Sequence, residues 1–97
     1  MRIVAKRTLR LFWEQEHDAE QPLKSWFAIA SKADWTSPQD VKATYGNASI
    51  VGGDRIVFNI GGNKYRLIVR FDYPWRIGFV RFIGTHAEYD QVDASSV

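Results

Sequence analysis

Residues 55–72 read RIVFNIGGNKYRLIVRFD, a pattern that predicts a β-hairpin. On both sides of the centre, apolar side chains recur at every second position, which is the period of a strand with one buried face. The centre, Gly61-Gly62-Asn63, consists of residues that tolerate positive φ and suit a tight turn. On the second strand, one face should hold Arg66, Ile68 and Arg70.

The hairpin is expected to continue into a third antiparallel strand. The run Tyr73-Pro74-Trp75 turns the chain, and residues 76–83 alternate again. Residues 1–5 contain two adjacent β-branched side chains and predict a further short strand, and residues 48–51 predict a brief one. One face of the third antiparallel strand, residues 76–83, should hold Ile77, Phe79, Arg81 and Ile83.

Helical periodicity predicts helices before this sheet. Residues 7–16 carry apolar side chains at i, i+3 and i+4, and residues 18–32 do the same. Asp18 is expected to cap the second helix, and Ser37-Pro38 should begin a third, short helix that ends near Tyr45. The fold class is therefore α+β: a small twisted, mainly antiparallel sheet, an N-terminal helical hairpin packed on one face, and a short C-terminal helix.

Length and composition set the broad class. Ninety-seven residues form one domain, 1–97, and a content of 45% hydrophobic and 14% aromatic residues supplies a core. No cysteine is present, which excludes disulfides and thiolate metal sites and suits a reducing cytoplasm. The N-terminal apolar run is too short for a signal peptide, and no run approaches the ~18 residues of a membrane span. We therefore expect a cytoplasmic protein with no membrane partner.

Charge is distributed unevenly along the chain. Residues 55–84 contain six basic residues and one acid, a net charge of +5, whereas the remainder contains seven basic residues and ten acids, a net charge of −3. A basic field on strand-rich sequence indicates a surface that binds a polyanion.

The run Thr85-His86-Ala87-Glu88 fits a capping box and predicts a short helix. His86 would then lie at the positive end of the helix dipole, which favours a neutral imidazole able to accept a proton. Tyr89 and Asp90 follow at i+3 and i+4 and should share a face with His86. His17, in the turn between helices, is interpreted as structural.

The strand arginines are the candidate phosphate ligands. Arg66 and Arg70 share a strand face, Arg81 lies on the next strand, and the planar fork of arginine grips two phosphate oxygens at once. Lys64 has two interpretations of equal weight, surface solubility and ligand contact. Asn59 and Asn63 are candidates to orient a ribose or phosphate. The glycine turn lacks the spacing of a nucleotide-binding loop. No metal or cofactor is expected, because the two histidines are distant and no carboxylates cluster.

Two segments carry a family resemblance. Val57–Leu67, followed by Arg81–Asp90, resembles the HigB-type mRNA interferase toxins of bacterial type II toxin–antitoxin systems, which are similar to the wider RelE group. The resemblance extends over nearly the whole chain. It implies a RelE-like fold, translation-linked cleavage of mRNA on the ribosome, and neutralisation by a HigA-type antitoxin with a helix-turn-helix domain. It also makes Arg66 the phosphate clamp. Asn59 falls where RelE has a catalytic lysine and Tyr89 where RelE has its C-terminal tyrosine, whereas His86 has no clear counterpart.

Two functions follow from these residues. The first is a metal-independent endoribonuclease in which Arg66, Lys64 and Arg81 stabilise charge while His86 and Tyr89 transfer protons or stack. The second is a non-catalytic RNA- or protein-binding module with a basic sheet face.

An antitoxin is expected in one of two positions. Acids near Arg66, Arg70 or Arg81 would give salt-sensitive binding, whereas docking on helical faces that carry Phe12, Trp13 and Trp26 would be nearly independent of salt. The second position is the preferred prediction.

Overall fold

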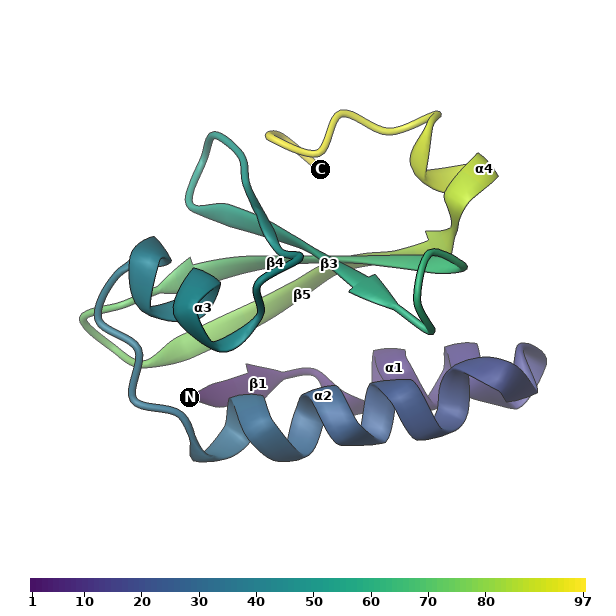
Figure 1. Cartoon of the computed structure of the whole chain (residues 1–97), viewed down its shortest axis with the longest axis horizontal. Helices are drawn as coiled ribbons and strands as arrows, with labels where there is room; N and C mark the ends of the chain where they lie inside the picture. Colours follow the sequence, from purple (N-terminus) through teal and green to yellow (C-terminus); the bar gives the residue numbers. More distant parts are fainter.

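A computed structural model describes residues 1–97, and its central element is a five-stranded sheet. The strands are β1 (Arg2–Val4), β2 (Ser49–Ile50), β3 (Arg55–Ile60), β4 (Tyr65–Asp72) and β5 (Ile77–Thr85). The helices are α1 (Lys6–Gln15), the 3-10 helix η1 (His17–Ala19), α2 (Glu20–Lys32), α3 (Pro38–Thr44) and α4 (His86–Tyr89). The strand order is β1-β5-β4-β3-β2, and α1 and α2 run side by side against one face (Figure 1). The α+β prediction is confirmed.

The hairpin β3–β4 forms in the predicted register. Asn59 lies opposite Arg66 and Val57 opposite Ile68, so each pair shares one face of the sheet. Gly61 and Gly62 adopt φ of 63° and 69°, which explains why the turn requires glycines. Strand β5 then pairs antiparallel with β4. The three predicted strands therefore build the centre of the sheet.

The strand β5 departs from its predicted pattern. It runs to Thr85, two residues beyond the expected end. Ile68 opposes Phe82 whereas Val69 opposes Val80, so Arg81 is the extra residue of a β-bulge. The predicted common face for residues 77, 79, 81 and 83 is wrong, because the bulge puts Phe79 opposite Arg70 and Ile83 opposite Leu67 on the other face.

The predicted N-terminal strand pairs with β5 and lies parallel to it, with Ile3 opposite Gly78. This pairing joins the two ends of the sequence and makes the sheet mixed rather than purely antiparallel. No helix of the chain combines the length and apolar character that crossing a membrane requires.

The core lies between the helices and the sheet. Leu9, Trp13, Leu23 and Trp26 from the helical hairpin are all buried, as the periodicity predicted. Phe58 on β3 is the centre of an aromatic cluster, with ring centroids 5.1 Å from both Trp26 and Tyr45. The hydroxyl of Tyr45 donates to the carbonyl of Trp26 at 2.9 Å, which fixes α3 against α2.

The two predicted helix caps have different outcomes. Ser37 caps α3 as expected, because its hydroxyl accepts from the backbone N–H of Asp40 at 3.3 Å. The prediction for Asp18 is wrong: α2 begins after Ala19 without a side-chain cap, and Asp18 lies in η1 and pairs with Lys64. Lys64, which is 46 residues away in the sequence, binds the Asp18 carboxylate, so this carboxylate does not cap α2.

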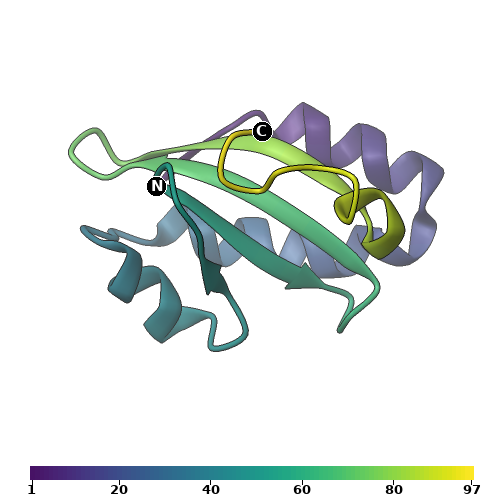
Figure 2. The same ribbon diagram turned by 90° about the horizontal axis from the view of Figure 1, so that it is seen from above.

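The face of the sheet turned away from α1 and α2 is covered in part by residues 90–97, which return over it after α4 (Figures 1 and 2). Arg55 and Arg81 both donate through Nε to the carbonyl of Val97, at 2.9 Å and 3.1 Å. We call this face the open face; Val57 and Ile68 belong to it and are nevertheless buried.

Candidate active site

The candidate site lies on the open face where β4 begins and β5 ends. Arg66 is opposite Asn59 on β3 and opposite Gly84 on β5, so these three positions form one row across the sheet. Only 9% of Arg66 is exposed, which is unusual for an arginine without a carboxylate partner. The row places a fixed positive charge beside the start of α4.

The guanidinium of Arg66 is held by the hairpin turn. Its Nη2 donates to Oδ1 of Asn63 at 2.6 Å, and its Nη1 donates to the backbone carbonyls of Asn63 and Tyr65, both at 3.3 Å. On the other side, the ring of Tyr89 lies 5.9 Å from the guanidinium carbon, a cation–π distance. These contacts orient the fork in advance of any ligand.

The helix α4 brings His86, Tyr89 and Asp90 to the same site. The predicted capping box is present: Glu88 accepts from the Thr85 N–H at 2.8 Å, and the Thr85 hydroxyl accepts from the Glu88 N–H at 3.2 Å. The rings of His86 and Tyr89 are 6.4 Å apart, at an interplanar angle of 71°. His86 Nδ1 lies 3.4 Å from the Asp90 carboxylate.

Gly84 is a structural requirement that sequence reasoning missed. A Cβ atom at this position would lie 2.6 Å from the ring of Phe82 and 3.1 Å from the Glu88 carboxylate. A side chain there would displace either the ring or the carboxylate that caps α4. The available signal was a glycine inside a strand pattern, which often marks a close approach.

Three predicted site residues lie away from this cluster. Lys64 pairs with Asp18 beside the helical hairpin; their hydrogen bond lowers the pKa of Asp18 and raises that of Lys64. Arg70 lies four residues along β4 from Arg66, with its guanidinium 4.7 Å from the ring of Phe79. Arg81 is in the bulge and contacts Val97.

The structure therefore brings together one cationic fork, one imidazole and one phenol, with an amide and a carboxylate orienting them: Arg66, His86, Tyr89, Asn63 and Asp90. Asn59 lies in the same row and is exposed. No group of three or more histidine, aspartate or glutamate side chains is arranged to hold a metal ion. This constellation can neutralise an anion and move a proton beside it.

Comparison with known proteins agrees with the sequence resemblance. Residues 19–92 match the family model of HigB_toxin, described as the RelE-like toxic component of a toxin-antitoxin system. The chain is also 26% identical over 72 residues to the mRNA interferase HigB of Escherichia coli O6:H1, covering 72% of this chain and 70% of that protein. The matched family segment contains the hairpin, β5 and α4. The chain belongs to the HigB family of RelE-like toxins of toxin–antitoxin systems.

Proposed function

We propose that this chain is an endoribonuclease that cuts mRNA during translation and is neutralised by a HigA-type antitoxin with a helix-turn-helix domain. The observation that carries the reaction is the orientation of Arg66 by Asn63 beside His86 and Tyr89. Family membership implies an antitoxin partner and an RNA substrate. The related E. coli protein is named for mRNA cleavage, which supports mRNA as the substrate class.

The proposed reaction is attack of a ribose 2′-oxygen on the adjacent phosphorus. The 2′-hydroxyl loses its proton to a base, the new P–O bond forms, and the bond to the 5′-oxygen breaks as that oxygen takes a proton. The products are a 2′,3′-cyclic phosphate and a 5′-hydroxyl, so no water molecule is consumed in this step. Charge accumulates on the non-bridging oxygens, where a preorganised donor is most effective.

Each residue has a role in this scheme. The fork of Arg66 binds the two non-bridging oxygens. The Asp90 carboxylate lies 3.4 Å from His86 Nδ1, so the other ring nitrogen is the one that would exchange a proton with the substrate. Tyr89 stacks on a base or supplies the second proton. Lys64 can contact the substrate only after its ion pair with Asp18 breaks. Asn59, Arg70 and Arg81 hold the flanking nucleotides on the open face.

Replacing His86 by glutamine should reduce cleavage by about 10²–10⁴-fold, because general acid–base groups contribute that much. RNA affinity should change little, since Arg66 remains. Single-turnover cleavage of a translated mRNA in the presence of a chelator, with RNA affinity measured by fluorescence anisotropy, separates the two quantities. Tyr89→Phe tests in the same way whether Tyr89 supplies the second proton.

The same assay distinguishes the enzyme from a binding module. A module that only holds RNA phosphates would behave in these assays as the unsubstituted chain does, whether it carries His86→Gln or Tyr89→Phe. That result would contradict the proposal. Cleavage that requires a metal ion and leaves a 3′-hydroxyl would also contradict it. A 2′,3′-cyclic or 3′-phosphate end supports it.

The capping box should matter more for activity than for stability. Thr85→Val should lower the free energy of unfolding by about 1 kcal/mol, the usual cost of a lost cap. It should also reduce cleavage clearly, because α4 positions His86 and Tyr89. Ser37→Ala is the matched control: it removes the cap of α3, far from the site, at a similar cost. Equal activity of the two variants would show that α4 does not need its cap to work.

A further inference from the structure

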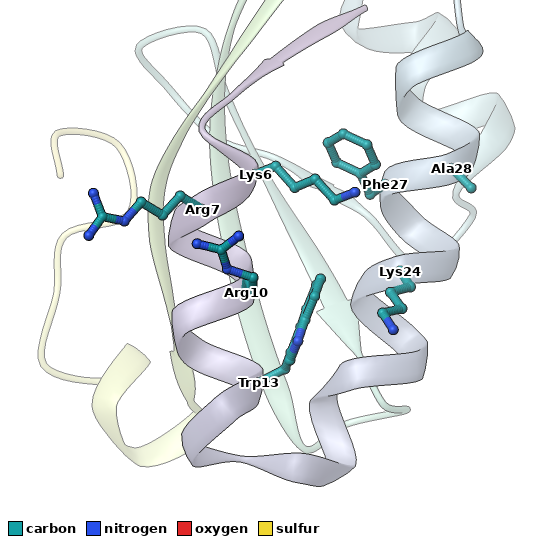
Figure 3. A pocket seen from close by; sticks show the side chains of 7 residues that line it. All are labelled: Lys6, Arg7, Arg10, Trp13, Lys24, Phe27 and Ala28. Atoms are coloured by element: carbon teal, nitrogen blue, oxygen red, sulfur yellow. The ribbon is translucent and has the colours of Figure 1, made fainter.

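A groove runs between α1 and α2 on the side of the helical hairpin that faces away from the sheet (Figure 3). Its volume is about 410 Å³. Four cations and no acid line it, above two aromatic rings. We call this surface the basic groove, and it is formed by Lys6, Arg7, Arg10, Lys24, Trp13, Phe27 and Ala28.

Helix stability does not account for two of these cations, Lys6 and Arg7. Lys6 and Arg7 occupy the first turn of α1, where no acid is present and where positive charge opposes the helix dipole. No carboxylate lies within 4.0 Å of either side chain, whereas Arg10 and Lys24 each have one at i±4. The acids of the hairpin are concentrated at its turn, at the other end. Charges placed against local stability indicate an external partner.

The floor of the groove is apolar but closed to base stacking. Trp13 is only 8% exposed, and the ammonium of Lys24 lies 5.4 Å from its ring centroid. The ammonium of Lys6 covers Phe27 at 4.8 Å. A nucleobase would have to displace both lysines to stack. Carboxylates can instead pair with these ammonium groups at the rim while aliphatic side chains fill the hollow.

The same packing limits how far Trp13 and Trp26 themselves can contribute to the predicted docking face. Trp13 and Trp26 are buried in the core, and the large apolar side chains that these two helices expose are Leu11 and Ile29. The surface that remains between the helices is charged. Any partner held there should bind more weakly as salt rises.

We propose that the basic groove binds an acidic amphipathic segment of a partner protein, laid between α1 and α2 as a third helix. Charge complementarity identifies the occupant, and a hollow between two neighbouring helices is the shape that a helix fills. The groove is on the helical hairpin, which packs on the face of the sheet opposite the open face (Figure 1). Because the strand register puts Arg66 on the open face, a bound segment leaves the candidate active site uncovered. This proposal goes beyond the cleavage reaction and does not depend on it.

The test uses a fluorescein-labelled amphipathic peptide of about 20 residues, with leucine on one face and glutamate on the other, long enough to be helical when bound. Its affinity for the full chain is measured by anisotropy against a peptide with glutamine in place of glutamate. We expect the acidic peptide to bind more tightly and its affinity to fall with salt. Lys6→Glu should weaken binding about tenfold, because a favourable pair becomes a repulsive one.

Two further variants make the test specific. Lys32→Glu changes the charge equally on the same hairpin but outside the groove, and should leave affinity nearly unchanged. Ala28→Phe fills the exposed wall of the groove without a charge change, and should weaken binding. Lys6→Glu should keep its melting temperature, since an acid in the first turn favours the helix.

Equal losses in Lys6→Glu and Lys32→Glu would overturn the proposal, because they would reveal attraction to net charge alone. Absence of acidic-peptide binding at millimolar concentration would also overturn it. So would binding of a single-stranded RNA that depends on Lys6 and displaces the peptide, since the groove would then be a nucleic-acid site. Because no cleavage is measured, each of these results leaves the proposed reaction to its own test.

Discussion

Arg66→Gln should reduce cleavage of a translated mRNA by about 10²–10³-fold, the usual cost of removing one preorganised donor to a developing anion. The size of this effect follows from the contacts of the guanidinium. Asn63 and two backbone carbonyls already hold it, so the fork is not reorganised when the phosphate arrives. Glutamine cannot supply either the charge or the paired donors.

Arg66→Lys separates charge from geometry. Lysine keeps the positive charge but lacks the planar fork, so we expect it to recover only a small part of the activity. Lys32→Gln removes one positive charge from an exposed position on α2 and serves as the control. Cleavage by Arg66→Gln at the wild-type rate would exclude this residue as the phosphate ligand. Circular dichroism and the melting temperature check that the fold persists.

Phe58→Ala should destabilise the chain by about 3–5 kcal/mol, the range for removal of a large core aromatic. Phe58 is 1% exposed and its ring contacts Trp26, Tyr45 and Phe71, so one truncation opens a cavity between α2 and the sheet. Domains of this size have about 5–15 kcal/mol of stability in total. The melting temperature should fall by about 15 °C or more.

Trp75→Ala is the control for the core prediction. It removes a larger aromatic side chain, but Trp75 is 76% exposed in the β4–β5 turn. Its effect on the free energy of unfolding should stay within about 0.5 kcal/mol. Thermal and urea unfolding of both variants measure the difference. A similar loss in both would mean that burial does not govern stability at these positions.

Local patterns predicted the parts of the fold that local interactions determine. The hairpin β3–β4 follows from alternation and a glycine turn, and the caps at Ser37 and Thr85 follow from short-range hydrogen bonds. The parallel partner of β1 and the bulge at Arg81 depend on pairing between distant segments, which periodicity does not encode. Asp18 shows the same limit, because Lys64 binds it from across the sequence.

The candidate site was predictable to a similar extent. The capping box located His86 and Tyr89 on one short helix, and strand periodicity put Asn59 and Arg66 on one face. That Asn63 would orient Arg66 was not visible, because it depends on how the turn folds back. Lys64 was expected beside Arg66, yet its side chain pairs with η1 instead. The spacing of residues along a strand indicates which face of the sheet a side chain lies on, but not which other residue it contacts.

The pairing of β1 with β5 has a consequence for the timing of toxicity. A chain is synthesised from its N-terminus, and residues 2–4 find their partners only once residues 77–79 exist. His86 and Tyr89 appear later still, after the last strand is complete. The growing polypeptide therefore has neither a finished sheet nor α4 until residues 77–89 have been made. Fragments released by premature termination before residue 85 lack part of β5 and all of α4 and should therefore be harmless, so a nonsense mutation upstream of that codon should let a cell escape this toxin.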